Sequence, residues 1–415
     1  MSRPDAGDPA PEVPARDLVR WGTVKAHRRL EAWTGTIDGT RPTLLFVLHN
    51  SGGGTFRYAK AVARLVRGSA NVIYGIGIRE RRLILCRNPD FRDAGISFNL
   101  PAEIPDLIST AGRLGVARVN VVHALGFEAR LAELLLAWGL PYDITLTDYH
   151  LAAATPHLLD ENHRYIGDAS RTTTRRDRPG FVDNAERIVA CSRHLAASMR
   201  EFWPDLDIVA SAPIDAPAAG YAGAVWRPVW PGAPLRVLLV NASLRLKGAR
   251  TFARAAEIAM ANGLPLEFHL VLDATHPQRV TVDLANVIQY DSDQHQLSSA
   301  VASVVSQAKP HLAWFPFEAP ETYSFVLSDA LENRLPILAS AIGAIPERLH
   351  GRRLTWLMPP DTSPEGWLAM LTRLRTFRLC LRPVRKPIGD LPPARPFFPD
   401  VFMEPLRGWR QHPLP

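Results

Sequence analysis

The sequence predicts an α/β protein with two Rossmann-like domains, each a doubly wound parallel sheet, facing each other across a cleft. Its 415 residues exceed what one hydrophobic core usually serves. Short apolar runs alternate with helical stretches along most of the chain, as in proteins with parallel sheets. Residues 213–234, rich in Pro, Gly and Ala, separate two such series and predict an interdomain linker.

Composition excludes several classes of protein. No apolar run approaches the roughly 18 residues of a membrane span, and residues 1–17 lack the apolar core of a signal peptide. We therefore expect a cytoplasmic protein. The net charge of +7 favours anionic partners, but no nucleic-acid recognition motif accompanies it, so nucleic-acid binding is not expected. The spacing of Cys86, Cys191 and Cys380 fits neither a metal site nor a disulfide framework and predicts reduced thiols.

Residues 1–34 are predicted to form a disordered leader followed by a basic amphipathic helix. The first fourteen residues hold too few large apolar groups to bury anything. The helix then carries apolar or aromatic side chains at three-residue steps, namely Leu18, Trp21, Val24, His27 and Leu30. Such a helix packs against the first domain or, alternatively, rests on an acidic membrane surface at the inner face of the cell membrane.

Residues 35–212 are predicted to form the N-terminal Rossmann-like domain. The run TLLFVLH at 43–49 is typical of a buried parallel strand. A glycine turn and a helix at 55–66 follow it. Further strands are predicted at 71–78, 119–125, 142–147 and 187–191, with helices at 127–138 and 193–203.

Residues 235–380 are predicted to form the C-terminal Rossmann-like domain. Its pattern repeats the strand and helix alternation of the first. Strands are expected at 235–241, 267–273, 287–291, 311–317, 335–340 and 354–358, with helices at 248–262, 294–308, 324–334 and 364–375. The Pro-rich tail at 381–415 contains aromatic residues, which predict that it packs on the body of the protein.

Three polar groups follow strands of the first domain, where open α/β sheets bind ligands. Gly52, Gly53 and Gly54 leave a turn without side chains, which lets backbone N–H groups approach a phosphate or a sugar. His123 could bond a sugar hydroxyl or be a core histidine. Asp148, flanked by Thr147, Tyr149 and His150, could act as a base, orient an acceptor or cap a turn.

The second domain offers cations and acids. Arg245 and Lys247 precede Gly248 and a predicted helix, an arrangement that suits a diphosphate. Glu321 and Asp329 stand eight positions apart at the start of another predicted helix, near enough to serve one ligand. The pair Asp291 and Asp293 is interpreted as acids at a helix start and not as a metal-binding motif.

In chain order, these residues resemble the retaining family-four glycosyltransferases of the GT-B fold, especially bacterial members that assemble polysaccharide or O-antigen chains. The resemblance spans about residues 43–374. Its most specific part, PETYSFVLSDALENRLPILASAIGAIPERL, is similar to the family's Glu-x7-Glu donor segment. HNSGGG, ITLTDY and the Lys247–Gly248 pair match further landmarks in order.

The resemblance implies a role for each site residue. Glu321 would contact the transferred sugar, Asp329 the ribose hydroxyls and Lys247 the diphosphate. The glycine turn would line the cleft, and His123 would face the sugar. The remaining donor-binding residues would be Arg245, Gly248, Thr322, Tyr323, Ser324 and Phe325.

Three positions depart from the family pattern: Asp329 replaces the usual Glu, Ala242 the usual Arg and Thr147 the usual His. The implied activity is transfer of a hexose or deoxyhexose from a nucleoside-diphosphate sugar to a glycan or lipid-linked glycan, without a cofactor or metal. Two alternatives remain open. One is a catalytically degenerate GT-B partner that binds nucleotide sugar or scaffolds a glycan assembly complex, and the other is a nucleotide-sugar epimerase.

Overall fold

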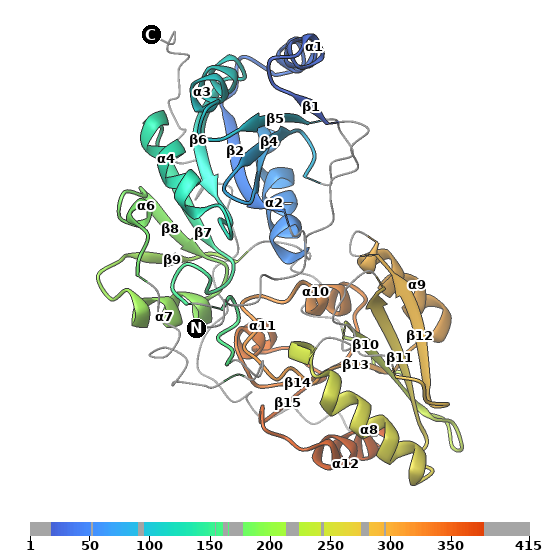
Figure 1. The fold of residues 1–415 in the computed structure, drawn as a ribbon. Helices are drawn as coiled ribbons and strands as arrows, with labels where there is room; N and C mark the ends of the chain where they lie inside the picture. Colours follow the sequence, from blue (N-terminus) through green and yellow to red (C-terminus); the bar gives the residue numbers. More distant parts are fainter. Residues whose placement is uncertain are drawn as a thin grey trace, which may run out of the picture.

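The computed structural model describes residues 18–50, 53–89, 95–153, 155–160, 165, 177–212, 224–241, 245–274, 282–293 and 296–376. These residues carry two sheets, one above the other in Figure 1. We call the part with β1–β9 the first domain and the part with β10–β15 the second. The predicted leader, the tail at 381–415, Gly52, Ala242 and Cys380 lie outside the described residues.

The first domain holds a nine-stranded sheet in the order β1-β5-β4-β3-β2-β6-β7-β8-β9. Its central strand, β2, is buried at every residue, as the continuous apolar run predicts. The strands are β1 (Val19–Arg20), β2 (Thr43–His49), β3 (Asn71–Ile78), β4 (Arg82–Cys86), β5 (Ile96–Asn99), β6 (Val116–Val121), β7 (Tyr142–Leu146), β8 (Arg187–Ala190) and β9 (Ile208–Ala210).

Most of this sheet is parallel, but β4 runs antiparallel to both β3 and β5. The sequence did not predict β4 or β5. Only Arg79, Glu80 and Arg81 connect β3 to β4, too few for the crossover that a parallel neighbour requires. Arg79 and Glu80 adopt positive φ angles of 42° and 44°, and this turn reverses the chain without the glycine that usually marks one.

The second domain holds a six-stranded sheet in the order β12-β11-β10-β13-β14-β15. All its neighbouring strands are parallel, and the order is that of a dinucleotide-binding Rossmann fold. This sheet confirms the predicted parallel α/β architecture. Its strands are β10 (Leu235–Val240), β11 (Leu266–Asp273), β12 (Val287–Ser292), β13 (Leu312–Phe315), β14 (Ile337–Ser340) and β15 (Thr355–Met358).

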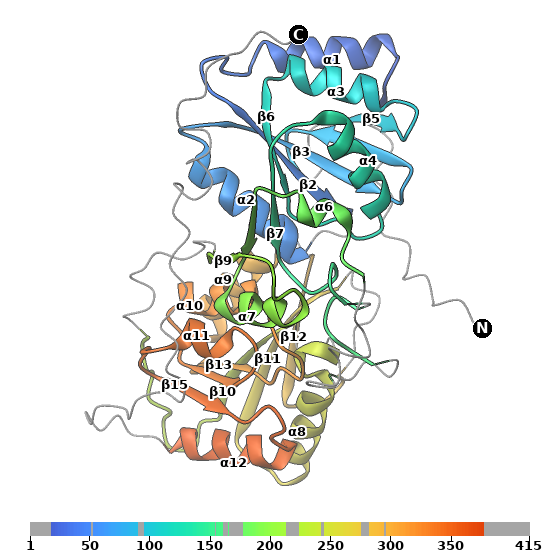
Figure 2. The same cartoon turned by 90° about the vertical axis from the view of Figure 1, so that its left-hand side faces the viewer.

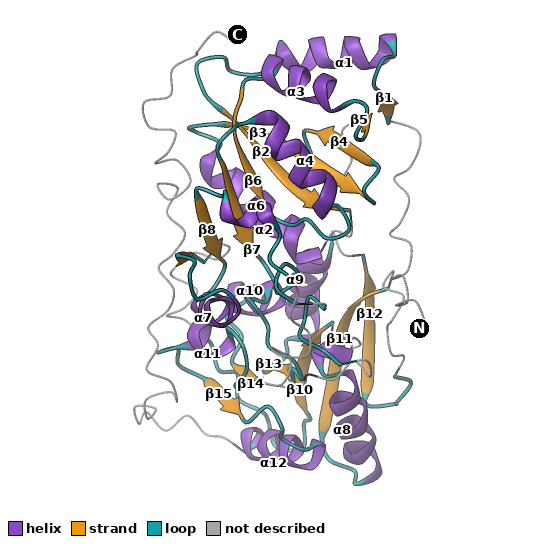
Figure 3. Ribbon diagram, turned by 60° about the vertical axis from the view of Figure 1, so that its left-hand side comes forward, coloured by secondary structure: helices purple, strands orange, loops and turns teal. Residues whose placement is uncertain are grey.

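Helices cover both faces of the second sheet because its strands are apolar on both faces. Leu235, Val237 and Leu239 of β10 pack in one cluster with α8 (Ala249–Ala261) and α12 (Pro364–Arg375). The intervening Leu238 and Val240 pack in another cluster with α9 (Leu297–Ala308), α10 (Phe325–Glu332) and α11 (Ile345–Leu349). Figure 3 shows α8 and α12 at the end of the molecule farthest from the first domain. Trp226 and Val229, predicted in the linker, pack on this domain.

Helices of the first domain are α1 (Val24–Thr34), α2 (Gly53–Val66), α3 (Ile104–Arg113), α4 (Glu128–Trp138), α6 (Gly180–Asp183) and α7 (Arg193–Phe202). Ala26, Leu30 and Trp33 of α1 are buried, so this helix packs on its own domain, beside α3 at the far end in Figure 2. The predicted start of α1 near Leu18 was wrong. Val19 and Arg20 pair with β5, and the helix begins after Thr23, whose side chain caps it.

The described helices include none with both the length and the apolar character needed to cross a membrane. Cys86 and Cys191 are buried free thiols. The two domains meet where α2 contacts α10 and where the loop after β7 contacts the loop after β13. These loops stand at the carboxyl ends of parallel strands, where ligands bind in open α/β sheets.

Gly248 fixes the packing of α8 against the end of β13, and it gives a test of the fold. It has a φ of 86°, and a Cβ at this position would lie 2.0 Å from the Pro316 carbonyl oxygen. Gly263, just beyond the same helix, has a φ of 60° but no atom within 4 Å of the Cβ position. An alanine costs about 1–2 kcal/mol at either position because of the left-handed backbone.

We expect Gly248→Ala to lose on the order of 2 kcal/mol more stability than Gly263→Ala, since only the former forces atoms into contact. Urea unfolding of both variants measures the difference. Equal losses would contradict the described packing.

Candidate active site between the two sheets

Two histidines and a carboxylate form a compact polar cluster at the end of the first sheet. His123 follows β6, and Asp148 and His150 follow β7. The His123 Nε2 atom lies 2.8 Å from Asp148 Oδ2, and the His150 Nδ1 atom lies 2.8 Å from Asp148 Oδ1. The two imidazoles stack with centroids 3.8 Å apart. The neighbouring β6 and β7 thus bring together residues that the sequence analysis treated as separate candidates.

Burial and proximity set the charges in this cluster. Burial alone would raise the pKa of Asp148, but the charge and hydrogen bond of His123 and the hydrogen bond of His150 hold that pKa well below its usual value. Burial, reinforced by His123, lowers the pKa of His150. His49 at the end of β2 packs edge-on against His123, and burial lowers its pKa well below 6.5. Asp148 is therefore ionised, whereas His49 is neutral at physiological pH.

The same three groups are close enough to be considered as metal ligands, since their ligating atoms lie within 4.8 Å of one another. The ring planes of His123 and His150 are only 12° from parallel, with centroids 3.8 Å apart. A ligating imidazole places the metal in the plane of its own ring, and one ion cannot lie in two stacked planes. The arrangement therefore suits an orienting hydrogen-bond network better than a metal centre.

Lys247 and Glu321 form the corresponding pair on the second domain. The Lys247 Nζ atom lies 2.6 Å from Glu321 Oε1, and both side chains keep some exposure, 21% and 16%. Lys247 ends the short 3₁₀ helix Arg245–Lys247, directly before Gly248 and the start of α8. The Arg245 side chain lies outside the described part. A cation and a carboxylate beside a helix N-terminus form an electrostatically polarised site.

The backbone of Glu321 is held by a close approach of another loop. The Ala344 N–H group donates to the Glu321 carbonyl at 2.7 Å. A Cβ on Gly343 would lie 2.4 Å from that oxygen, and Gly343 has a φ of 62°. The turn around Gly343 therefore returns to the Glu321 loop, and only glycine fits there.

His157 lies within electrostatic reach of both clusters. Its pKa is lowered chiefly by burial, and Asp148 and His123 from the first domain act on it together with Glu321 and Lys247 from the second. Its side chain is nonetheless exposed to water. Both observations hold for a side chain that protein surrounds on most sides but solvent still reaches. The sequence analysis did not single out His157.

Residues Thr322 to Phe325 join the Glu321 loop to the first domain. The Thr322 hydroxyl donates to the Thr147 carbonyl oxygen at 2.6 Å. Tyr323 is buried in the core of the first domain, and Phe325 packs against that core. Ser324 has a φ of 73°, a strained value for a residue with a side chain. Segments of the two domains that are 175 positions apart therefore touch at this point.

Arg348 holds the strained turn in place. Its buried guanidinium donates to the Tyr323 and Ser324 carbonyl oxygens at 2.9 and 2.6 Å. The same group donates to the Ser328 hydroxyl at 2.8 Å and lies 3.9 Å from the centre of the Tyr323 ring. Sequence analysis missed Arg348, although it belongs to the segment that carries the family resemblance.

Asp329 has a partner that the sequence did not suggest. Arg57 of α2 donates to both its carboxylate oxygens, at 3.0 and 2.9 Å. Asp329 is buried, with 1% of its side chain exposed, whereas Arg57 is 26% exposed. Arg57 also covers the Phe325 ring, and Gly54 lies beside that ring with its Cβ position 3.6 Å away. Gly53 and Gly54, which begin α2, thus stand next to the acidic segment.

A second acid binds across the domains at the start of α7. Glu347 of α11 accepts the backbone N–H groups of Arg193 and His194 at 3.1 and 3.0 Å. Burial raises the pKa of Glu347.

The predicted acid pair Asp291 and Asp293 lies elsewhere in this domain. Asp293 accepts the Gln296 N–H just before α9, whereas Asp291 lies in β12.

Comparison with known proteins identifies the fold. No protein-family model and no curated protein matches the sequence. The structure is similar to Anabaena Alr3699/HepE in complex with UDP and glucose, with a TM-score of 0.55, 14% identity and coverage of 81% of this chain and 90% of that chain. A glycosyltransferase from Rickettsia africae ESF-5 is similar with a TM-score of 0.54 and 13% identity, covering 80% of this chain and 88% of that chain. Sucrose-phosphate synthase from Thermosynechococcus elongatus is similar with a TM-score of 0.51 and 16% identity, covering 80% of this chain and 90% of that chain. The fold is therefore GT-B, with two Rossmann-like domains.

The buried histidines predict a pH-dependent stability. A histidine whose pKa is lowered in the folded state binds a proton more weakly there than in the unfolded chain, so it destabilises the fold as the pH drops below the unfolded value of 6.5. We expect the free energy of unfolding to fall between about pH 6.5 and about pH 5, by up to about 1.4 kcal/mol per pH unit for each histidine. His49→Gln should flatten this slope, and replacement of the exposed His27 should not. Thermal unfolding across this range tests the expectation, and an unchanged slope in His49→Gln refutes it.

The Arg57–Asp329 pair predicts a coupling between the domains. Arg57→Ala leaves the Asp329 carboxylate buried without its counter-charge, so we expect a loss of about 2–3 kcal/mol in the free energy of unfolding. The double variant Arg57→Ala/Asp329→Ala should lose less than the sum of the two single variants. Urea unfolding of all four proteins measures the coupling, and strictly additive losses would show that the pair contributes nothing as a pair.

Proposed function

We propose that this protein is a retaining glycosyltransferase that moves a hexose or deoxyhexose from a nucleoside-diphosphate sugar to an acceptor hydroxyl in bacterial surface glycan assembly. The observation that carries the proposal is the 2.6 Å hydrogen bond from Thr322 to the Thr147 carbonyl oxygen. It joins the loop of the Lys247–Glu321 pair to the loop that carries Asp148 of the His123–Asp148–His150 cluster. The GT-B fold and the UDP and glucose bound to Alr3699/HepE support it.

The donor's diphosphate would bind Lys247 and the N-terminus of α8. Lys247 supplies a positive charge. The first N–H groups of α8 have no acceptor within the helix, so they are available to a phosphate bound at its N-terminus. Glu321, now bound to Lys247, would accept hydrogen bonds from the hydroxyls of the transferred sugar. The donor would in this way satisfy both members of the pair.

Two buried hydroxyls could serve the same ligand. The Thr147 and Ser324 side-chain oxygens have no hydrogen-bond partner among the residues that the structure describes. Each belongs to one of the loops that join the domains, and buried polar atoms are normally satisfied. A polyhydroxylated substrate would supply the missing partners.

The chemistry requires orientation and charge stabilisation more than a nucleophile. In front-face transfer with retention, the bond from the anomeric carbon to the phosphate oxygen breaks as the acceptor oxygen approaches from the same side. The leaving phosphate then takes the acceptor proton. Lys247 would stabilise the negative charge that grows on that phosphate, so the proposed site needs no metal ion.

Asp148 would orient and not act as the base. Both its oxygens are engaged by histidines, and its lowered pKa makes it a weak proton acceptor. It would fix the imidazole of His123, whose Nδ1 atom also accepts the Leu125 N–H group at 3.2 Å. His123 would therefore bond the sugar only by giving up one of these two contacts. Asp329 would reach the ribose only by sharing its carboxylate with Arg57.

Variants at the charged pair test the proposal. Loss of one preorganised charge contact typically lowers the rate about a hundred- to a thousandfold, and we expect losses of this size for both Lys247→Ala and Glu321→Ala. Glu257→Gln, which alters an exposed acid of α8, should keep full activity. The measurement is acceptor-dependent release of nucleoside diphosphate from a panel of nucleotide sugars.

Three outcomes would contradict the proposed function or its site. Full activity in folded Lys247→Ala and Glu321→Ala would overturn the assigned site. Donor binding without turnover on any acceptor would favour the degenerate GT-B partner. Donor conversion that needs no acceptor would favour an epimerase.

A further inference from the structure

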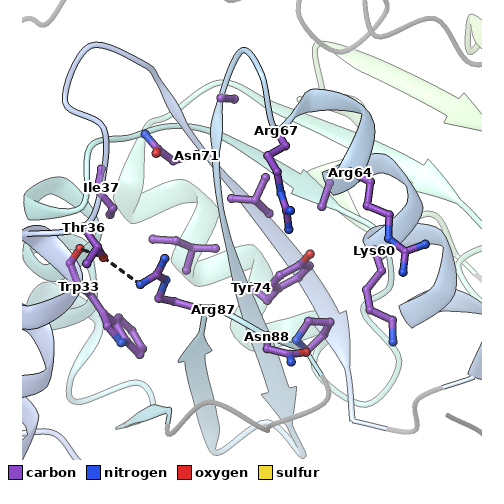
Figure 4. A pocket seen from close by; sticks show the side chains of 15 residues that line it. Trp33, Thr36, Ile37, Lys60, Arg64, Arg67, Asn71, Tyr74, Arg87 and Asn88 are labelled. Atoms are coloured by element: carbon purple, nitrogen blue, oxygen red, sulfur yellow. Dashed lines mark hydrogen bonds between the residues drawn. The ribbon is translucent and has the colours of Figure 1, made fainter.

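A cavity lies in the first domain, apart from the Lys247–Glu321 pair. It has a volume of about 580 Å³ and is enclosed by α2, the end of α1 and the residues that follow β4. Figure 4 shows it between Trp33 and Thr36 on one side and Lys60, Arg64 and Arg67 on the other, with Tyr74 between them. Cavities of this volume hold small organic molecules.

The charge of this cavity has one sign. Every charged side chain in its described lining is a cation, namely Lys60, Arg64, Arg67 and Arg87. Arg87 donates to the Thr36 hydroxyl at 2.8 Å, so its guanidinium is held in place without a carboxylate. No acid of the described chain pairs with Arg64 or Arg67, and both side chains are exposed. Guanidinium groups with free donors suit a phosphate.

The aromatic residues of the lining suit an organic group attached to that phosphate. Trp33 and Tyr74 are buried hydrophobic side chains that nevertheless border the cavity. Flat apolar faces next to donors are the usual composition of small-molecule sites. A bare inorganic ion would leave this part of the lining unused.

Helix α2 connects the cavity to the domain boundary. Arg57, Lys60 and Arg64 follow one another at steps of three and four, so they lie along one face of the helix. Arg67 comes three residues later, just beyond the end of the helix at Val66. Arg57 binds Asp329 of the second domain, whereas the other three line the cavity. Arg64 is seven residues from Arg57, about 10 Å along the helix axis. This distance is comparable with the length of a sugar linked to a diphosphate.

We propose that the cavity binds the phosphate or diphosphate group of the acceptor, whose sugar extends along α2 toward the domain boundary. The assignment of the ligand as the acceptor rests on the proposed glycosyl transfer, whereas the binding of a phosphate does not. The acceptor is thus a sugar phosphate or sugar diphosphate, either free or attached to a lipid.

Direct binding of a phosphate probe tests the site. Calorimetry measures inorganic pyrophosphate binding in a Lys247→Ala background, which removes the proposed donor contact. We expect Arg64→Ala/Arg67→Ala to weaken binding at least about tenfold, because charge-assisted hydrogen bonds from guanidinium groups are among the strongest that a protein makes with an anion. Arg28→Ala/Arg254→Ala removes two exposed arginines elsewhere and should change binding less than about twofold at constant salt. Equal weakening in both double variants, or none in either, overturns the proposal.

Two further ligands distinguish the sources of the phosphate. Glucose 1-phosphate represents a free sugar phosphate, and phosphatidylcholine vesicles with and without phosphatidic acid represent a lipid. Binding of either that depends on Arg64 and Arg67 supports the site and assigns the source. Arg64→Lys/Arg67→Lys, which keeps the charge but loses the forked donors, should bind with intermediate affinity. Failure of both ligands to bind overturns the proposal.

Kinetics separate this proposal from the proposed function. In an active enzyme, Arg64→Ala/Arg67→Ala should raise KM for a phosphorylated acceptor about tenfold and leave KM for the nucleotide sugar unchanged. Absence of transfer with pyrophosphate binding that still depends on the arginines would refute glycosyl transfer and keep the anion site. Normal KM for every phosphorylated acceptor would refute the acceptor assignment alone.

Discussion

The bidentate contact between Arg57 and Asp329 fixes the geometry on which the rest of the site depends. Asp329 lies in α10, and Arg57 lies in α2. Their contact sets the start of α10 against the first turns of α2 and so positions the loop that carries Glu321. A buried carboxylate is stable only with a counter-charge, so this loop is held against the first domain by electrostatics.

The loop itself is shaped by its backbone more than by its side chains. Ser324 stands at a positive φ, and such strain persists only where the surroundings determine the conformation. Arg348 supplies that determination from the second domain by binding two of the loop's carbonyl oxygens. The close approach of Gly343 holds the other end, at Glu321. Glu321 is therefore preorganised by neighbours that need not touch a substrate.

The sequence predicted the second sheet and the central strands of the first because buried strands have a strong signal, but it missed the outer strands β1, β4, β5 and β9. Continuous apolar runs such as residues 43–49 and 235–240 are strands in the structure. The β3–β4 turn was missed because non-glycine residues adopt positive φ there, which composition does not reveal. The resemblance assigned Lys247 and Glu321 to different parts of one donor, and the structure brings the two side chains into contact. Arg57 could not be paired with Asp329, since the two are 272 positions apart and no local pattern links them. His157 was missed because its neighbours come from both domains.

The cap of α7 is divided between the two domains. Ser192 accepts the Leu195 N–H from within the first domain, but the two preceding N–H groups depend on Glu347 of the second. A helix end without acceptors loses stability. Each domain would therefore lose stability if it were produced alone. The first domain would lose two of the hydrogen bonds that cap α7, and the Glu347 carboxylate of the second domain would lose the two N–H groups that it binds.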